Sequence, residues 1–352
     1  MAMPSRMEDR ILVLSKLKQA NYATILTDAN LIAGKRVPVE APVFGQPDIK
    51  RWTNQSLSMV GHDYATLAQQ VEREMTESLQ LVGDSWLLAW LFAFAMGNVV
   101  STQPNAVGAP AAWQHVIKPL DPSAAGKDLP VTTIYAEAAA AANLQRRLQS
   151  MAVKDVTLEF PSSAPLKATA NLVGSGQVTS GALATPPALM TLVPLMSNDL
   201  VFKYGPQGAP VDISSQIVHG SVKFGFTWNL DDANSRAPGG GLFRSRAWVG
   251  SPHISLEFQR MVDDAASAPN DDWLADTIQE VLFSVNGPLI AVAEFHRISI
   301  RGLAVIPTVV KLGQSGDKSV YQYTIAPDHW LKQGAADVVT VTCENTETSF
   351  LV

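Results

Sequence analysis

The chain has 352 residues, of which 47% are hydrophobic and 16% are charged, and its formal net charge is −6. This composition excludes global disorder and supplies enough apolar residues for a sizeable core, while the length predicts two domains or one large one. The mild acidity argues against a protein that holds nucleic acid by its phosphates, because that mode of binding needs clustered Lys and Arg. A charged fraction below the average of about 25% is typical of a surface partly buried against other subunits.

The single cysteine, Cys343, rules out a disulfide within the chain and a cysteine-based zinc site. The amino-terminal stretch has neither the long apolar region nor the cleavage site of a secretory signal. We therefore expect the protein to be made in the cytoplasm of its cell of origin.

The first part of the chain shows weak signals. Residues 1–21 carry a faint apolar stripe among basic residues, which indicates a short helix or an arm. Residues 22–47 read as strand and loop, and the prolines within Lys35–Ile49 favour an edge strand or an extended arm. Residues 51–68 fit no single pattern.

The strongest local signal is the apolar run Trp86–Met96. Asp84 and Ser85 are N-cap candidates before it, and Gly97 is a C′ candidate after it. The run predicts a helix over 85–96 that is too short to cross a membrane, which takes roughly 20 apolar residues. Because this helix is apolar on every side, we expect a β-rich layer to fold around it.

The stretch after this helix, Ser101–Pro130, is rich in Pro, Gly and Ala, and we expect this second arm to contact a partner. It contains a predicted strand at 113–117. Further strands are predicted at 131–137, 152–160 and 166–174, the last two as a hairpin, and 138–150 reads as helix or loop. Residues 174–198 are rich in small and turn-forming residues and are interpreted as a link between halves.

The second half predicts strands again, followed by one helix. Asp271 or Asp272 caps that helix, which spans 272–285, and Gly287 lies beyond its end. The predicted strands lie at 201–205, 211–217, 221–230, 253–262, 289–307, 320–327 and 337–343.

The two helices suggest an internal repeat. In each half a strand-like segment, 72–82 or 253–262, precedes Asp, Trp, a helix and Gly, which is typical of a duplicated unit. This parallel makes 72–82 a predicted strand despite its helix-forming residues. The predicted fold class is mainly β, with some helix (α+β). We expect two tandem β-sandwich or barrel modules, each flanked by a helix. The first spans 1–198 and has helix 85–96 and long arms, and the second spans 199–352 and has helix 272–285.

No residue stands out as catalytic, cofactor-binding or metal-binding. The histidines are not at metal-ligand spacing, and Gly239–Gly241 lacks the strand and helix of a phosphate-binding loop. The acidic residues Asp263, Asp264, Asp271, Asp272 and Asp276 are better explained as loop and cap residues than as a cation site. The six histidines are His62, His115, His219, His253, His296 and His329.

The order of these parts resembles that of the major tail proteins, or tail tube proteins, of long non-contractile-tailed bacteriophages. The likeness covers most of the chain and lies in pattern and order. Its segments are VPVEAPVFG at 37–45 followed by the helix, AWQHVIKPLDP at 112–122 leading to TTIYAEA, the hairpin 152–176, HGSVKFGFTWNLDDANS at 219–235, and ADVVTVTCENTET at 336–348.

This resemblance implies a structural virion protein without enzymatic activity, cofactor or membrane contact. Subunits of that family join sheet edges into rings, which stack into a hollow tube that conducts DNA during ejection. Six chains form a ring, or three chains with pseudo-sixfold symmetry if each carries two modules. The implied partners are further copies and other tail proteins (tape measure, terminator, distal tail). The chain would be made in the host bacterial cytoplasm and end in the virion tail, where an acidic lumen would let DNA slide.

Two alternatives share much of this pattern. Another tail or virion protein, such as a terminator, a baseplate hub or a decoration protein, has a similar composition and lacks catalytic groups. A hydrolase on a β-scaffold would need clustered acid, base or metal groups in a pocket, of which the sequence carries no trace. Self-assembly into long filaments of one component separates the tube protein from both.

Overall fold

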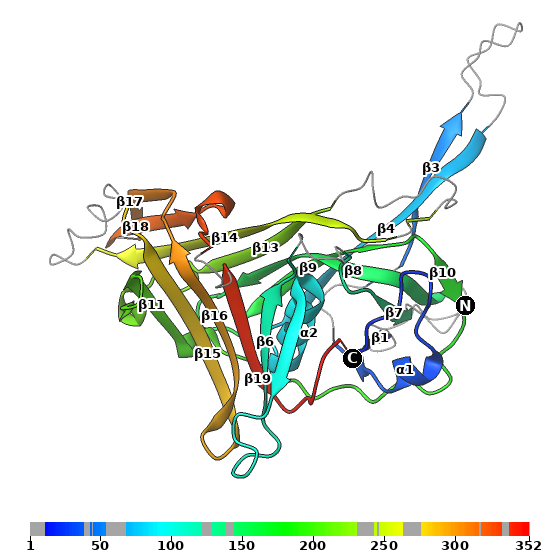
Figure 1. Cartoon of the computed structure of the whole chain (residues 1–352), viewed down its shortest axis with the longest axis horizontal. Helices are drawn as coiled ribbons and strands as arrows, with labels where there is room; N and C mark the ends of the chain where they lie inside the picture. Colours follow the sequence, from blue (N-terminus) through cyan, green and yellow to red (C-terminus); the bar gives the residue numbers. More distant parts are fainter. Residues whose placement is uncertain are drawn as a thin grey trace, which may run out of the picture.

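The computed structural model describes residues 11–38, 43, 45–53, 68–121, 128–137, 144–230, 243–244, 246–262, 276–316, 318–332 and 338–351. Two antiparallel sheets enclose one long helix, as Figure 1 shows. The prediction of a mainly β fold is confirmed.

The larger sheet has twelve strands and mixes early and late parts of the chain. Along its main path it runs β17 (Val309–Ser315), β18 (Lys318–Ile325), β14 (Val249–Met261), β13 (Lys223–Leu230), β8 (Gln145–Glu159), β7 (Thr132–Glu137), β1 (Ile11–Leu14) and β2 (Lys35–Arg36). Off this path, β9 (Lys167–Gly174) joins β8 to β4 (Ala68–Val82), β3 (Asp48–Thr53) pairs with β4, and β10 (Val178–Ser180) pairs with β8.

The smaller sheet has seven strands. Its order is β12 (Val211–Asp212), β11 (Leu200–Pro206), β15 (Gln279–Ala291), β16 (Glu294–Val305), β19 (Val339–Asn345), β6 (Trp113–Pro119) and β5 (Gly97–Thr102). Short helical pieces connect the strands, namely α1 (Asp28–Ile32) and three 3-10 turns at Ser197–Asp199, Ser214–Gln216 and Pro327–His329.

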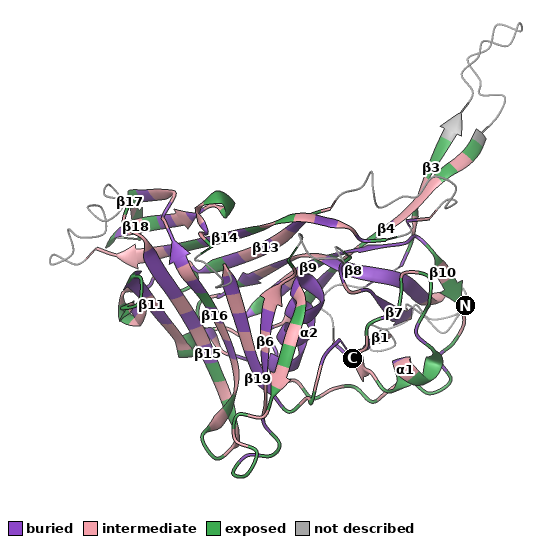
Figure 2. Ribbon diagram, viewed as in Figure 1, coloured by how far each residue is buried: buried purple, intermediate pink, exposed green. Residues whose placement is uncertain are grey.

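The central helix, α2 (Ser85–Met96), begins and ends where the sequence predicts. The Asp84 side chain accepts hydrogen bonds from the amides of Trp86 and Leu87, and Gly97 closes the helix with a φ of +82°. All twelve helical residues are buried, as the purple ribbon in Figure 2 indicates. Both sheets contact this helix, through β8 on one side and through β6 and β19 on the other. It is therefore the plug between two β layers that its uniform apolarity predicts.

The predicted strand at 72–82 is confirmed as part of β4, although its residues favour helices. Leu79 and Leu81 are buried while Ser78 and Gln80 are exposed, which is the period of two that a half-buried strand requires. The predicted hairpin at 152–160 and 166–174 is confirmed as the antiparallel pair β8–β9.

The predicted helix at 272–285 is wrong. Residues 279–285 belong to β15, in which Val281, Phe283 and Val285 are buried and alternate with less buried neighbours. The spacing of four between Val281 and Val285 fits a strand as well as a helix, and the pairing of this segment with β11 and β16 makes it a strand. Asp271, Asp272 and Trp273 lie outside the described residues.

Three smaller predictions also need correction. Residues 11–14 form strand β1 instead of a helix or arm, because they pair with β7. The stretch 22–47, predicted as strand and loop, contains the short helix α1, which Thr27 caps. Residues 145–150, predicted as helix or loop, begin β8, while 138–143 lie outside the described part of the chain.

The two sheets do not follow the predicted module boundary at 198/199. β8 pairs with β13 in the larger sheet, and β6 pairs with β19 in the smaller one. Each sheet thus contains strands from both sides of the boundary. The predicted repeat of strand, helix and glycine is not kept in the second half, because residues 279–285 form a strand there.

Candidate assembly surface

The β3–β4 hairpin leaves the body of the protein. Residues 75–82 of β4 pair with β9, whereas residues 68–74 pair only with β3. Figure 1 shows this hairpin projecting from the larger sheet. Because β4 is continuous, the projecting part extends a strand that is anchored in the core by Met75, Leu79 and Leu81.

The hairpin has little to stabilise it on its own. Lys50 and Glu72 form an exposed ion pair at 2.8 Å, and Arg73 bonds to Gln70 on the same strand. Val71 is 52% exposed. Exposed ion pairs contribute about 0–1 kcal/mol, and an isolated two-stranded hairpin is marginally stable in water. The hairpin therefore gains little stability from its own described polar contacts.

The two arms predicted from proline content each contribute residues to the protein's own sheets. Within Lys35–Ile49, residues 35–36 form β2, Val43 is buried, and the amide of Gly45 bonds to Glu77 at 2.6 Å. Within Ser101–Pro130, β6 lies inside the smaller sheet and the turn at 103–112 leaves it. Residues 39–42, 44 and 122–127 lie outside the described part of the chain. The structure also has a projecting arm in the β3–β4 hairpin, which begins at the end of the first predicted arm, at Asp48 and Ile49.

Strand β5 is an open edge of the smaller sheet. Among the described residues it pairs with β6 alone, and its exposure alternates along GNVVST. It contains no charged residue and no proline, and its pairing with β6 has no irregularity. Val100 is 56% exposed on its outer side. Proteins usually protect such edges with charge, proline or a bulge, so an unprotected edge tends to pair with another chain.

The other sheet edges carry such protection. Asp212 lies in β12, Lys311 lies in β17, and Glu77 lies in the part of β4 that pairs with β9 alone. β5 therefore differs from these edges in composition as well as in its position. Whether a strand is an edge depends on the sheet order, which is why sequence reasoning missed it.

The outer face of the smaller sheet is open and almost neutral along its middle. Six residues on neighbouring strands lie in one cross-strand row without a charge, namely Val201, Ser284, Ser299, Thr342, Val116 and Val100. Beside this row, Arg301 bonds to the buried Glu280 at 2.7 Å, and Arg297 bonds to the buried Glu344. These guanidinium groups are thus already paired with carboxylates of the sheet itself.

One histidine, His115, has a structural role in the core. His115 is fully buried, and its Nδ1 lies 2.8 Å from the Ser101 hydroxyl while its Nε2 lies 3.2 Å from Asn345. Burial lowers the pKa of His115, although the hydrogen bond with Asn345 acts in the opposite direction. His62 lies outside the described residues, as do Gly239–Gly241.

One pair has the composition of a catalytic site. Ser85 Oγ lies 2.8 Å from His296 Nδ1, and Asp84 immediately precedes Ser85 in the sequence. Ser85 is buried, however, and the Asp84 carboxylate accepts hydrogen bonds from the amides of Trp86, Leu87 and Val193. The Asp84 carboxylate is thus occupied by backbone amides and does not orient His296, and the Ser85 hydroxyl is not accessible to a substrate. This geometry does not support a catalytic triad.

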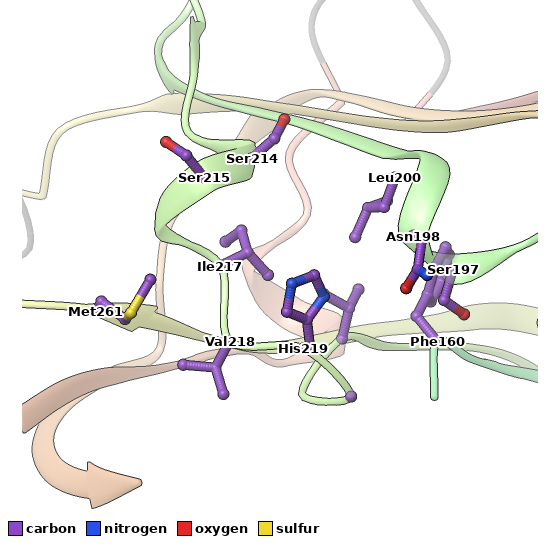
Figure 3. A pocket seen from close by; sticks show the side chains of 12 residues that line it. Phe160, Ser197, Asn198, Leu200, Ser214, Ser215, Ile217, Val218, His219 and Met261 are labelled. Carbon is purple, nitrogen blue, oxygen red and sulfur yellow. The ribbon is translucent and has the colours of Figure 1, made fainter. Parts of the chain in front are cut away.

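Two surface hollows are well defined among the described residues, and neither gathers an acid, a base and a nucleophile. The first is a cavity of about 300 Å³ with an uncharged, partly apolar lining, seen in Figure 3. It is lined by Phe160, Leu200, Ile217, Val218, Val222 and Met261 together with Ser197, Asn198, Ser214, Ser215, His219 and Gly220. The second, of about 600 Å³, is lined by Lys154, Thr227, Trp228, Asn229, Leu230, His253, Ser255 and Pro327.

Neither a metal cluster nor a membrane helix emerges from the described ranges. No group of three His, Cys, Asp or Glu side chains there is placed to hold a metal ion. No helix in the part of the chain that the structure describes is long and apolar enough to span a bilayer. Asp263, Asp264, Asp271 and Asp272 fall outside that part.

Comparison with known proteins adds no assignment. No protein-family model matches the chain, and no curated protein matches it.

Proposed function

We propose that this chain is a structural virion protein that self-assembles into rings, and that the rings stack into a phage tail tube through which DNA passes. The observation that carries the proposal is the unprotected edge of β5. An uncharged strand with exposed backbone groups is an aggregation hazard in a monomer, whereas a strand of a neighbouring copy would complete it. The resemblance to tail tube proteins supplies the reason to expect that neighbour to be another copy.

The β3–β4 hairpin supports the same proposal. Its six-residue strand β3 is about 20 Å long at roughly 3.3 Å per residue, so the hairpin reaches well beyond the sheet that anchors it. Placed across a neighbouring subunit, it would bury Val71 and gain the contacts that it lacks alone. A contact of this kind would tie one ring subunit to the next.

The open face of the smaller sheet is suited to a channel wall. DNA phosphates are held by free Lys and Arg, but Arg297 and Arg301 on this face are already bound to Glu344 and Glu280. A wall with a neutral middle row and paired charges would touch DNA without retaining it. This differs from the acidic lumen that the resemblance implies.

The resemblance implies the number of chains in a ring. Six copies would form it if each chain supplies one module, and three copies if each supplies two. The partners would be the same chain and the other tail components, and the location would be the virion tail. Another virion protein of similar fold is the second candidate, since an open edge and a projecting hairpin also suit a terminator or hub.

A charge placed on the β5 edge tests the proposal. Val100→Lys puts an ammonium group at the middle of the edge, where pairing with a second strand would bury it. We expect sedimentation velocity to show large assemblies for the unmodified protein and monomers for this variant. Gln80→Lys, at an exposed position of β4, is the matched control and should assemble normally. Equal assembly of Val100→Lys and the unmodified protein would remove the carrying observation.

A further inference from the structure

The hairpin formed by β15 and β16 ends in an apolar tip. Leu289 is 57% exposed, Val292 is 68% exposed and Phe295 is 39% exposed. The turn between the strands is Val292–Ala293, because Ala291 pairs with Glu294. Figure 2 shows the exposed end of this hairpin at the bottom of the view.

The turn has an unusual sequence for a solvent-exposed hairpin. Two-residue turns favour Asn-Gly and related pairs, because their backbone needs positive φ angles. Here Ala293 adopts a φ of +63°, which non-glycine residues rarely do. Strained backbone of this kind concentrates at functional contacts, and an apolar side chain in water gains by being covered.

A second turn at the same end of the sheet is also free of charge. β16 and β6 run in the same direction, since both pair antiparallel with β19, so the turn at 103–112 projects from the end that carries the β15–β16 tip. Val107 in that turn is 97% exposed. Between residues 103 and 112 there is no charged residue, and between 287 and 295 the one charge is Glu294. This end of the sheet is therefore a weakly charged, partly apolar surface.

The cavity in Figure 3 has matching chemistry. Leu200, Ile217 and Met261 surround it, and no Asp, Glu, Lys or Arg is among the described residues that line it. A site whose lining is uncharged and partly apolar accepts an uncharged apolar group more readily than a charged one. The tip supplies such a group.

The tip of one molecule cannot fill its own cavity. Leu200, in the cavity wall, pairs with Val285 of β15. Val292 lies seven residues further along the same hairpin, which is about 23 Å away at roughly 3.3 Å per residue. A knob and a hole on separate parts of one chain can meet only between copies, in a head-to-tail contact that repeats.

We propose that Leu289 and Val292 at the tip of one copy dock in this cavity on a second copy. The contact rests on the proposed function, because it is a second way in which assembled copies hold each other. It specifies the two surfaces that meet when copies stack. One is the β15–β16 tip, and the other is the cavity beside β11. Since the two surfaces differ, each added copy leaves one tip and one cavity free for the next.

Two variants test the two halves of the contact. Val292→Asp puts a charge on the tip, and Val218→Asp puts one in the cavity. Leu312→Asp, on an exposed leucine of β17, is the control. Circular dichroism and thermal unfolding establish that each variant folds, and a variant that fails this check is replaced by Leu289→Asp or Ile217→Ser. We expect each interface variant to lose long assemblies in sedimentation velocity, while the control keeps them.

Mixing the variants makes the test specific. The tip variant retains an intact cavity, and the cavity variant retains an intact tip. In the mixture, the tip of the cavity variant can dock in the cavity of the tip variant, and no further contact of this kind can follow. Sedimentation should therefore show a species that joins one unit of each variant and that neither variant forms alone. Failure of the mixture to add this step overturns the proposal, as does normal assembly of Val292→Asp or of Val218→Asp.

Other occupants give different results. If the unmodified protein stays monomeric at all concentrations, the proposed function fails and this contact fails with it. If it assembles and Val292→Asp assembles equally, only the contact is wrong. If the unmodified protein floats with phosphatidylcholine vesicles and Val292→Asp does not, the tip is a membrane contact and the second copy is the wrong partner.

Discussion

Trp228 of β13 donates its indole N–H to the backbone carbonyl of Ala95, in the last turn of α2. Both residues are fully buried. The carbonyls of the last helical turn have no partner within the helix, so this bond satisfies one of them from a strand 133 residues away. It ties the second half of the chain to the helix that the first half supplies.

Trp228→Phe should therefore destabilise the protein through the carbonyl that it leaves unsatisfied. A buried polar group without a partner costs about 1–3 kcal/mol, and loss of part of the indole adds a cavity. Trp330→Phe is a matched control, because its indole N–H has no hydrogen-bond partner within the described structure. Urea denaturation should give the larger loss for Trp228→Phe. An equal loss in both variants would show that ring volume, and not the hydrogen bond, decides.

The N-cap of α2 gives a second prediction. Asp84 is buried, and one of its carboxylate oxygens caps the helix while the other accepts the amide of Val193. Loss of a cap costs about 0.5–2 kcal/mol, and the orphaned Val193 amide adds to it. We expect Asp84→Ala to lose about 2–4 kcal/mol in denaturant unfolding and Asp84→Asn to recover part of this. Similar midpoints for both variants would contradict the role of the side-chain oxygens.

The carboxyl-terminal segment predicts a pH dependence. Burial raises the pKa of Glu347, but hydrogen bonds from Lys16 and Trp86 outweigh it and leave the pKa lowered. Burial lowers the pKa of His115, whose ring also packs edge-on against Phe350. A folded-state pKa below the unfolded value gives stability that is present above the unfolded value and is lost as the pH falls. Protonation of both groups should therefore lower the free energy of unfolding as the pH falls.

His115→Gln isolates one part of that effect. Glutamine can bond to Ser101 and Asn345 but does not titrate, so the variant should lose less stability between pH 7 and pH 5 than the unmodified protein does. Burial also lowers the pKa of His296, which retains its share of the slope. Thermal unfolding at several pH values measures the difference. Parallel curves for the two proteins would show that His115 does not contribute.

The projecting hairpin can be shortened without touching the core. Replacing residues 50–72 by a short turn of Asn and Gly keeps the part of β4 that pairs with β9. We expect a folded protein whose unfolding midpoint changes little, because the removed strands pair only with each other. Assembly should be lost or strongly reduced in sedimentation velocity. A shortened protein that still assembles would show that the hairpin does not join subunits.

Local signals predicted the elements that local chemistry defines. The helix 85–96 was predictable because Asp84 and Gly97 bracket an unbroken apolar run. The segment 272–285 was misread because Val281, Leu282 and Val285 fit a helical spacing as well as a strand, and only the pairing of this segment with β11 and β16 separates the two. The strand at 72–82 was predicted through a repeat that the structure does not keep, although the alternation of Leu79 and Leu81 alone indicates it.

The candidate site was less accessible from the sequence. That β5 is an edge follows from the pairing of residues such as His115 and Cys343, far apart in the chain, which periodicity does not encode. The apolar tip carried a readable signal, since PLIAVAEF lacks the residues that a hairpin turn favours. The cavity gathers residues from several elements and had no local signal at all.

The central claim is that copies of this chain complete one another. Negative-stain electron microscopy of the purified, unmodified protein over a range of concentrations tests it most directly. The account predicts rings or tubes of one component, with threefold or sixfold symmetry in end-on views. Uniform single particles with the size of one chain at every concentration would contradict it.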